Sequence, residues 1–337
     1  KMRVAIVHDD LVQWGGAERV LEGICQIYPD APIYTSVFDR NNKELVKRFG
    51  KKKIITSFLE KIPGWKSLYK ALLPLYPIAF EQFSFDNFDL VISHTTRFAK
   101  SIITKPETKH ICFCHTPPRF LWHFSGYGNL GFAEILMTKL RLYDQISANR
   151  VDYFLAGSEN AKRRIKKIYR KDSKVVYPFV DLERFKDIES FDGGYFLTVA
   201  RDNSYKRIDL AKEACMKIGV ELKIISGGLD DEMVVRILSG CKALIIPGLE
   251  DFGLVSLEAQ AIGKGVVAFR GGGALETIIE GKTGLFFDYP TVESLVKTLG
   301  KLNQIKENAC KENALKFSKQ IFAHNFKQTV ASMLYTN

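Results

Sequence analysis

Two glutamates eight positions apart have the chemistry needed to bind sugar hydroxyls. Glu250 and Glu258 lie in "PGLEDFGLVSLEAQAIGKG", where Pro247 and Gly248 open a loop between two apolar stretches. A carboxylate accepts hydrogen bonds from two neighbouring hydroxyls, so this pair suits a ribose and a hexose on either side of a diphosphate. For either glutamate alone, an ion pair or a charge at a helix start is the alternative.

Two cations upstream could bind the diphosphate itself. Arg201 and Lys206 lie five positions apart in "VARDNSYKRIDL", where a predicted strand gives way to a predicted helix. Arginine offers a planar fork and lysine a mobile point charge, and together they would clamp a diphosphate. Taken singly, each is better explained as surface charge.

Glycine-rich turns follow two further predicted strands. Gly15 and Gly16 stand in "WGGAERV", and a second turn has the sequence "GGGALE" at 271–276. Both turns open predicted helices, whose first N–H groups and positive end attract phosphate. A tight turn without a ligand is the alternative for the first pair, because it does not match G-x-G-x-x-G.

Alternating strands and helices must position these residues. Continuous runs rich in Val, Ile, Leu and Phe predict buried parallel strands, and the segments between them predict helices. The pattern breaks near Pro178 and restarts, so we expect two doubly wound α/β domains with a ligand cleft between their strand ends. The predicted strands are 3–9, 89–95, 110–116, 153–158, 195–201, 221–227, 242–248, 265–271 and 283–288. The predicted helices are 15–28, 131–151, 159–169, 207–219, 230–241, 253–263 and 274–281, with more helix to the C-terminus.

Composition is that of a soluble globular protein. The 337 residues are 46% hydrophobic and 26% charged, enough for two domains with their own cores. No apolar run is long enough to span a membrane, and the start "KMRVAIVHDD" predicts a strand rather than a signal peptide. The six cysteines are scattered, which favours reduced, buried thiols over a zinc or redox site.

The net charge of +11 is concentrated in one segment. Residues 42–70 contain nine Lys or Arg against two Glu, with Phe58 and Trp65 among the interleaved apolar residues. Basic residues mixed with aromatics suit an anionic membrane surface or a nucleic acid. No nucleic-acid-binding motif accompanies them, so we expect a membrane surface and no nucleic acid; an ordinary solvated face is the alternative.

Several of these motifs together resemble one family. "PGLEDFGLVSLEAQAIGKGVVAFRGGGALETIIEGKTGLFF" resembles the E-x7-E donor-site signature of retaining glycosyltransferases of family 4, which have the GT-B fold. "TVARDNSYKRIDL" is similar to that family's R-x4-K phosphate motif, and "GGAERV" to its N-terminal glycine loop. The resemblance covers nearly the whole chain and extends to bacterial enzymes, often mannosyltransferases, that build O-antigen and exopolysaccharide units.

The resemblance implies a domain for each substrate. Residues 1–176 would form an N-terminal Rossmann-like domain for the acceptor, and residues 177–318 a C-terminal Rossmann-like domain for the nucleotide sugar. The two would face each other across a cleft. Residues 319–337 would form a C-terminal helix that crosses back to the N-terminal domain.

It also implies roles for individual donor-site residues. Glu250 would contact the transferred sugar and Glu258 the ribose, while Arg201 and Lys206 hold and neutralise the diphosphate. The remaining donor contacts would be backbone groups of the first glycine turn and of the loop after Glu250, namely Gly15, Gly16, Phe252, Gly253 and Leu254.

A histidine completes the implied catalytic set of Glu250, His115, Arg201 and Lys206. His115, in "CHTPPR", matches the family's cleft histidine that hydrogen-bonds the sugar or acceptor. A core histidine is the alternative, and His94 is the weaker candidate for the same role.

The expected reaction needs no metal. With no D-x-D pair in a fitting context, the two cations and backbone dipoles would stabilise the departing diphosphate. The resemblance implies retaining transfer of a hexose, with GDP-mannose the favoured donor and a glycan or polyprenyl-diphosphate-linked acceptor, at the inner face of the cell membrane. The alternatives are another nucleotide-sugar enzyme of this fold, such as a UDP-sugar transferase or an epimerase, and a non-catalytic, membrane-associated sugar-nucleotide-binding protein.

Overall fold

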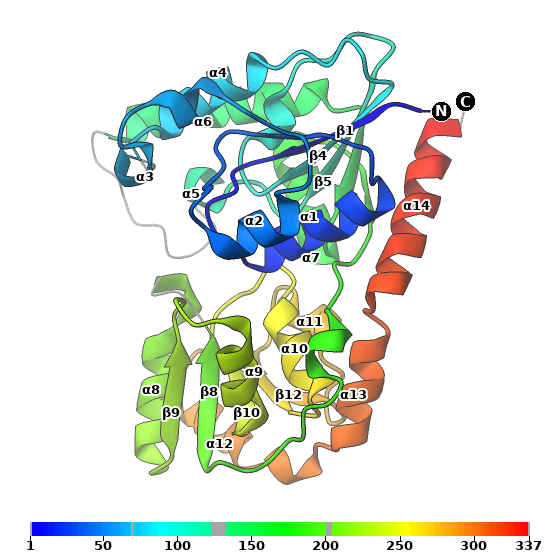
Figure 1. Cartoon of the computed structure of the whole chain (residues 1–337). Helices are drawn as coiled ribbons and strands as arrows, with labels where there is room; N and C mark the ends of the chain where they lie inside the picture. The colour runs from blue at the N-terminus through cyan, green and yellow to red at the C-terminus, as the bar shows by residue number, and fades with distance from the viewer. Residues whose placement is uncertain (1, 69–70, 123–132, 200–203, 336–337) are drawn as a thin grey trace. The chain divides into compact units, whose positions relative to one another are not determined.

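The chain forms two α/β units. The computed structural model describes residues 2–68, 71–122, 133–199 and 204–335. Within these, unit 1 comprises the residues up to 177 together with 323–335, and unit 2 comprises 178–322 (Figure 1). Each unit is built around its own parallel sheet.

Unit 1 contains a seven-stranded parallel sheet in the order β3-β2-β1-β4-β5-β6-β7. The longest strands, β4 and β5, are buried almost throughout, as expected for a sheet covered on both faces. The strands are β1 Val4–His8, β2 Ile33–Thr35, β3 Ile54–Thr56, β4 Leu90–Thr95, β5 Lys109–Cys114, β6 Tyr153–Ala156 and β7 Ser173–Val175.

Helices cover both faces of this sheet. The α4 and α6 helices pack with Ala5, Val7 and Val91 on one face, and α7 packs against β6. The opposite face contacts α1 and α14. The α-helices are α1 Gly16–Ile27, α2 Lys43–Phe49, α3 Trp65–Leu68, α4 Tyr76–Glu81, α5 Arg119–Trp122, α6 Ala133–Ser147 and α7 Glu159–Tyr169. In the described part of this unit, 3-10 turns lie at Phe58–Lys61, Leu73–Leu75, Ala99–Ser101 and Ala148–Arg150.

Unit 2 contains a five-stranded parallel sheet in the order β12-β11-β10-β8-β9. One face packs against α9, α10 and α11, and the other against α8 and α12. The strands are β8 Tyr195–Val199, β9 Glu221–Ile225, β10 Cys241–Ile246, β11 Val266–Phe269 and β12 Gly284–Phe287. The helices are α8 Ile208–Lys217, α9 Asp231–Ser239, α10 Leu254–Ala261, α11 Ala274–Thr277, α12 Val292–Leu299 and α13 Glu307–Leu315, with 3-10 turns at Leu182–Phe185, Ser204–Lys206 and Leu302–Gln304.

The last helix belongs to both units. The α14 helix spans Lys319–Tyr335, and the division between the units falls after Phe322. Phe322 packs against Phe179 in unit 2, with 5.2 Å between the ring centroids. Phe326, one turn later, packs against Phe113 of β5 in unit 1.

Most of the predicted elements are present, and the two parallel-sheet units confirm the predicted fold class. The helix predicted over 274–281 is wrong in its second half: α11 ends at Thr277, and Ile278 is extended. The strand predicted over 195–201 ends at Val199 within the described residues. The strands β2, β3 and β7 were not predicted, because three residues are too few to show a period.

Candidate active site

Glu250 lies at the carboxyl edge of the sheet in unit 2. β10 ends at Ile246, and the loop from Pro247 to Gly253 leads into α10. The Glu250 carboxylate forms an ion pair with the Lys206 ammonium, and both side chains are less than one-fifth exposed. Since β8 and β10 are neighbours, the strand-end positions predicted from the sequence do bring these two residues together.

Close backbone packing holds the two loops in place. A Cβ atom at Gly248 would lie 2.2 Å from the carbonyl oxygen of Tyr205, so only glycine allows this approach. On the other side of Glu250, the N–H of Gly273 donates to the Glu250 carbonyl oxygen at 2.9 Å. A Cβ atom at Gly273 would lie 2.3 Å from the Cα atom of Phe252. The "GGGALE" turn therefore supports the glutamate loop by direct backbone contact.

The start of α10 supplies backbone N–H groups beside Glu250. Gly253 is the residue before the helix and has φ of +90°, a conformation that favours glycine. Leu254 is the first helical residue, so its amide has no acceptor within its own helix. Phe252 is buried, and its ring packs against Phe317 at 5.7 Å between centroids.

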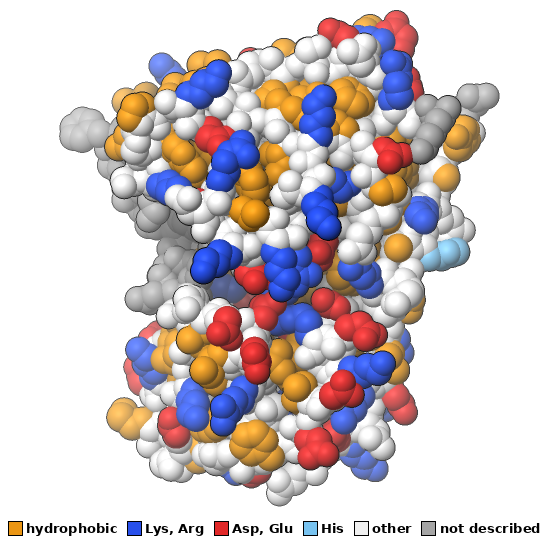
Figure 2. Space-filling view, in the orientation of Figure 1, with side chains coloured by type: hydrophobic (Ala, Val, Ile, Leu, Met, Phe, Trp, Pro, Cys, Tyr) orange, Lys and Arg blue, Asp and Glu red, His pale blue; other side chains and the backbone are white. Residues whose placement is uncertain are grey.

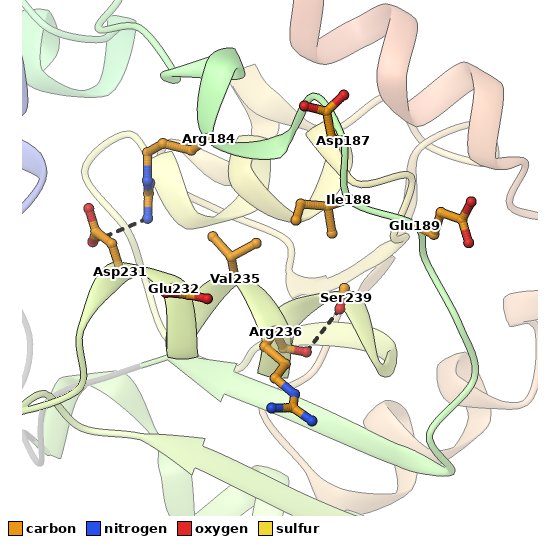
Figure 3. Close-up of a pocket in the computed structure, with 9 residues that line it drawn as sticks. All are labelled: Arg184, Asp187, Ile188, Glu189, Asp231, Glu232, Val235, Arg236 and Ser239. Carbon is orange, nitrogen blue, oxygen red and sulfur yellow. Dashed lines mark hydrogen bonds and ion pairs between the residues drawn. The ribbon is translucent and has the colours of Figure 1, made fainter.

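Glu258 is bound by an arginine that the sequence reasoning did not single out. The Arg184 Nη1 atom donates to Glu258 Oε1 at 2.8 Å, and Nη2 lies 3.3 Å from Asp231 Oδ1. Figure 3 shows Arg184 pointing toward Asp231, and both residues line a pocket of about 660 Å³. Glu250 and Glu258 each have a basic partner in this structure. The ion pair that was the alternative to a sugar contact is therefore present at both glutamates.

Arg201 lies outside the described residues. Its predicted partner Lys206 closes the 3-10 turn Ser204–Lys206, directly before the left-handed residue Arg207 that precedes α8. The Lys206 ammonium also lies 5.3 Å from the centre of the Tyr205 ring. An ammonium has three N–H donors, so the bond to Glu250 leaves capacity for oxygen atoms of a ligand.

In unit 1, Gly15 and Gly16 form the start of α1. Gly15 is extended and precedes the helix, and Gly16 is its first residue. Glu18, in the first turn, is buried, and its Oε1 atom lies 3.8 Å from His8 Nε2. The glycine turn therefore places a carboxylate against the end of β1.

Three histidines lie side by side at the carboxyl edge of the same sheet. His8 ends β1, His94 is in β4, and His115 follows β5. The Nδ1 atoms of His8 and His94 are 2.9 Å apart, and the Nε2 atoms of His94 and His115 are 2.7 Å apart. His8 and His94 are buried and His115 is partly exposed. The structure brings both histidine candidates into contact, and it adds His8 and Glu18, which the sequence reasoning missed.

The pKa values of the two buried rings, His8 and His94, are shifted in opposite directions. Burial acts against protonation of His8, but the nearby Glu18, with smaller effects of Asp9 and Asp10, raises the pKa of that ring above its ordinary value. Burial, reinforced by the neighbouring His115 and His8, lowers the pKa of His94 well below its ordinary value. His94 is therefore a neutral ring beside a ring that favours the charged form.

The loop after β4 is tied to the end of β1. The Asp9 carboxylate accepts hydrogen bonds from the backbone N–H groups of Thr96, Arg97, Phe98 and Ala99, at 2.7 to 3.0 Å. Arg97 in turn forms an ion pair with Asp10 at 2.6 Å. These contacts fix the strand ends that carry His8 and His94.

Comparison with known proteins assigns the chain to a class. A sequence model of Glycosyltransferase Family 4 matches residues 14–184, just over half of the chain, and one described as Glycosyl transferases group 1 matches residues 223–317. Sucrose-phosphate synthase from Thermosynechococcus elongatus has a similar structure, with a TM-score of 0.73, 14% identity and 99% of each chain covered. The Anabaena protein Alr3699/HepE, in complex with UDP-glucose, gives a TM-score of 0.67 at 14% identity, covering 98% of this chain and 100% of that one. The family and the GT-B fold define a glycosyltransferase.

The chain belongs to Glycosyltransferase Family 4, as its motifs predicted. Among curated proteins it is similar to the alpha-1,3/1,6-mannosyltransferase ALG2 of Dictyostelium discoideum, at 31% identity over 152 residues. That match covers 42% of this chain and spans only 36% of the relative's length.

Two features are absent from the described residues. Over those residues, no group of three or more His, Cys, Asp or Glu side chains has the arrangement needed to hold a metal ion. In the same part of the chain, no helix is both long enough and apolar enough to cross a membrane.

Proposed function

We propose that this chain transfers a hexose, with mannose favoured, from a nucleotide-diphosphate sugar to a glycan or lipid-linked acceptor with retention of configuration. The observation that carries the proposal is the ion pair of Lys206 with Glu250 after the carboxyl ends of β8 and β10. Glu258 lies in α10, the helix that follows the Glu250 loop. Ligands of doubly wound sheets bind at these strand ends. The similarity to an ALG2 mannosyltransferase supports mannose as the transferred sugar. GDP-mannose is the donor that we favour.

In this proposal the charges of unit 2 receive the donor. Lys206, with Arg201, binds the diphosphate and neutralises the charge that grows as the sugar leaves. Glu250 contacts the hexose and Glu258 the ribose, while amides of Phe252, Gly253 and Leu254 bind donor oxygens. The ion pairs of both glutamates orient their carboxylates for these contacts.

Unit 1 receives the acceptor. The glycines at the start of α1 approach the phosphate, and His115 hydrogen-bonds the sugar or the acceptor. Retention follows when the acceptor hydroxyl attacks from the face that the diphosphate leaves and a phosphate oxygen takes its proton. No metal is required, because the cations and backbone dipoles carry the stabilisation.

A panel of nucleotide sugars tests the reaction. The purified protein is incubated with GDP-mannose, UDP-glucose and related donors, each with and without a polyprenyl-diphosphate-linked sugar, with EDTA in parallel. We expect acceptor-dependent release of GDP from GDP-mannose, unaffected by EDTA, and an α-linked product by NMR. Epimerised donor would identify an epimerase, and nucleotide binding without release from any donor would identify a binding protein.

The basic segment 42–70 supports a second part of the proposal, peripheral attachment to the inner face of the cell membrane. Its exposed lysines include Lys43, Lys47, Lys51, Lys53 and Lys61. Figure 2 shows basic side chains interspersed with hydrophobic ones on the visible face of unit 1. Such a surface attracts anionic lipid headgroups.

Some residues of this segment have structural roles instead. The Lys52 ammonium donates to the carbonyl oxygens of Cys25, Tyr28 and Pro29, and so satisfies groups at the C-terminal end of α1. Phe58 and Trp65 are partly buried against the core of unit 1. The membrane test therefore uses the exposed lysines only.

The variant K51E/K53E separates membrane binding from chemistry. Each lysine near an anionic surface contributes about 1 kcal/mol, so we expect the variant to bind phosphatidylglycerol vesicles at least ~30-fold more weakly. Transfer to a water-soluble acceptor should be unchanged. The control K212E/K282E makes the same charge change on exposed lysines of unit 2 and should bind like the wild type. Equal loss in both variants would contradict a specific surface.

A further inference from the structure

Glu18, His8, His94 and His115 form one continuous row across unit 1. In the sheet, β4 lies between β1 and β5, and His8 is directly paired with His94 in the register of β1 and β4. The successive contacts are 3.8 Å from Glu18 to His8, 2.9 Å from His8 to His94 and 2.7 Å from His94 to His115. The row begins at a buried carboxylate and ends at the partly exposed ring that the proposed function places at the substrate.

The contacts of His8 determine which ring nitrogen donates and which accepts at each step of this row. His8 Nδ1 lies 3.3 Å from the carbonyl oxygen of His94, as well as 2.9 Å from His94 Nδ1. A carbonyl oxygen only accepts hydrogen bonds, so the contact with it assigns the donor role to His8 Nδ1. His94 Nδ1 is then the acceptor, and because a neutral imidazole carries one N–H, the hydrogen of His94 is on Nε2.

The same reasoning continues to His115. His94 Nε2 donates, so His115 Nε2 accepts and the single hydrogen of a neutral His115 is on Nδ1. Reversing the row would put a hydrogen of His94 against His8 Nδ1 and leave the His94 carbonyl without that donor.

We propose that Glu18, His8 and His94 are positioning residues that fix His115 in its Nδ1–H form and hold its ring for contact with the sugar or acceptor. This proposal rests on the role given to His115 in the proposed function. At one end of the row Glu18 forms an ion pair with a protonated His8. His94 accepts a hydrogen bond from His8 and donates one to His115, and so determines which nitrogen of His115 carries the hydrogen.

The surroundings agree with this role. Asp9 and Asp10 add negative charge near His8, and Arg97 is bound to Asp10. His94 lies between the rings of His8 and Phe113, with its centroid 5.0 and 5.6 Å from theirs. Glu18 Oε2 is buried without a hydrogen-bond partner, which costs stability that an apolar side chain would not lose. If Glu18 had only a structural role, an apolar side chain in its place would make the protein more stable.

The first test is spectroscopic and does not depend on activity. Long-range ¹H–¹⁵N correlation spectra of the ¹⁵N-labelled protein, assigned with single histidine variants, report which nitrogen of each ring carries a hydrogen. We expect Nε2–H for His94, Nδ1–H for His115 and both nitrogens protonated in His8 at neutral pH. A hydrogen on His94 Nδ1 or on Nε2 of a neutral His115 would overturn the proposal.

The second test compares two substitutions at His94. His94→Gln keeps an N–H near the position of Nε2, whereas His94→Phe fits the aromatic surroundings but has no donor. We expect His94→Phe to lower kcat about tenfold with little change in the donor KM, and His94→Gln to restore most of it. A merely structural role predicts the opposite order, with Phe at least as active as Gln.

The carboxylate has its own matched pair of variants. Glu18→Gln should remove one proton from His8 in the spectra and lower kcat several-fold. Glu22→Gln, one turn later on α1 and bound to Arg48, should change neither. An unchanged His8 in Glu18→Gln would count against the proposal. If His115→Ala leaves transfer intact, the role of His115 in the proposed function fails, whereas the hydrogen positions test the row independently.

Discussion

At the scale of the residue, the two glutamates differ in what holds them. Glu250 forms an ion pair with the ammonium of Lys206, a flexible side chain that can turn toward a phosphate. Glu258 accepts a hydrogen bond from the planar guanidinium of Arg184, which also forms an ion pair with Asp231. Glu258 is therefore the more rigidly held carboxylate. That suits a contact to the nucleotide, which is the same in every turnover.

This difference leads to a binding prediction. Glu258→Ala should weaken the binding of GDP at least ~10-fold, because hydrogen bonds to a charged group contribute roughly 1.5 to 3 kcal/mol. Glu250→Ala should leave GDP affinity within a factor of about two, since the sugar is absent, and should lower the rate of transfer. Isothermal titration of both variants measures this. Equal weakening in the two would show that the glutamates do not divide the donor between them.

At the scale of the element, a steric prediction concerns the turn after β11. Gly273→Ala should displace the loop of Glu250, because the new Cβ atom would lie 2.3 Å from Phe252 Cα and 2.5 Å from the Asp251 carbonyl oxygen. We expect transfer to fall at least tenfold and the protein to lose about 2 kcal/mol of stability. Both are measured by donor turnover and chemical denaturation.

Gly300→Ala is the matched control for this change. Gly300 has nearly the same backbone angles as Gly273, but a Cβ atom there would come no closer than 3.7 Å to its neighbours. The control should keep wild-type activity. Loss in both variants would mean that glycine is needed for a reason other than the contact with Phe252.

The site residues that could be predicted from the sequence are those that directly follow the ends of strands. The apolar runs of β8 and β10 placed Lys206 and Glu250 at the same sheet edge, and the structure pairs them. The contact of Arg184 with Glu258 joins residues 74 positions apart through a 3-10 turn with no periodic pattern, so no local signal reveals it. Glu18 is hidden for another reason: on an amphipathic helix an acid in the first turn reads as a surface charge.

At the scale of the whole molecule, unit 1 should lose stability as the pH falls. Burial lowers the pKa of His94 well below its ordinary value and that of His110 to about 3. The unfolded chain takes up protons at these residues near pH 6.5 and the native state does not. Each therefore removes up to ~1.4 kcal/mol per pH unit below about pH 6.5. His8 affects stability in the opposite direction, because its pKa is raised in the folded protein. Its stabilising contribution is fully present below pH 6.5 and is lost as the pH rises through its folded pKa.

Tryptophan fluorescence can follow unit 1 selectively. The three tryptophans, Trp14, Trp65 and Trp122, all belong to unit 1. Urea denaturation at pH 6.5 and 5.0 should show lower stability at the lower pH. His110→Gln, which can keep the hydrogen bond to Ser93, should reduce this pH dependence by the share of one histidine. The same pH dependence in the variant and the wild type would show that His110 is not kept neutral by folding.

The division of α14 between the units determines the order in which the protein can be completed on the ribosome. All of residues 178–322 are made before the part of α14 that places the fully buried Phe326 against Phe113. At the usual speed of translation, Phe326 is made roughly 10 to 40 s after Phe113, and the face of the unit 1 sheet at Phe113 is not covered by α14 during that time. Unit 2 is continuous in the chain and can fold during that interval, so the unit that begins first is finished last.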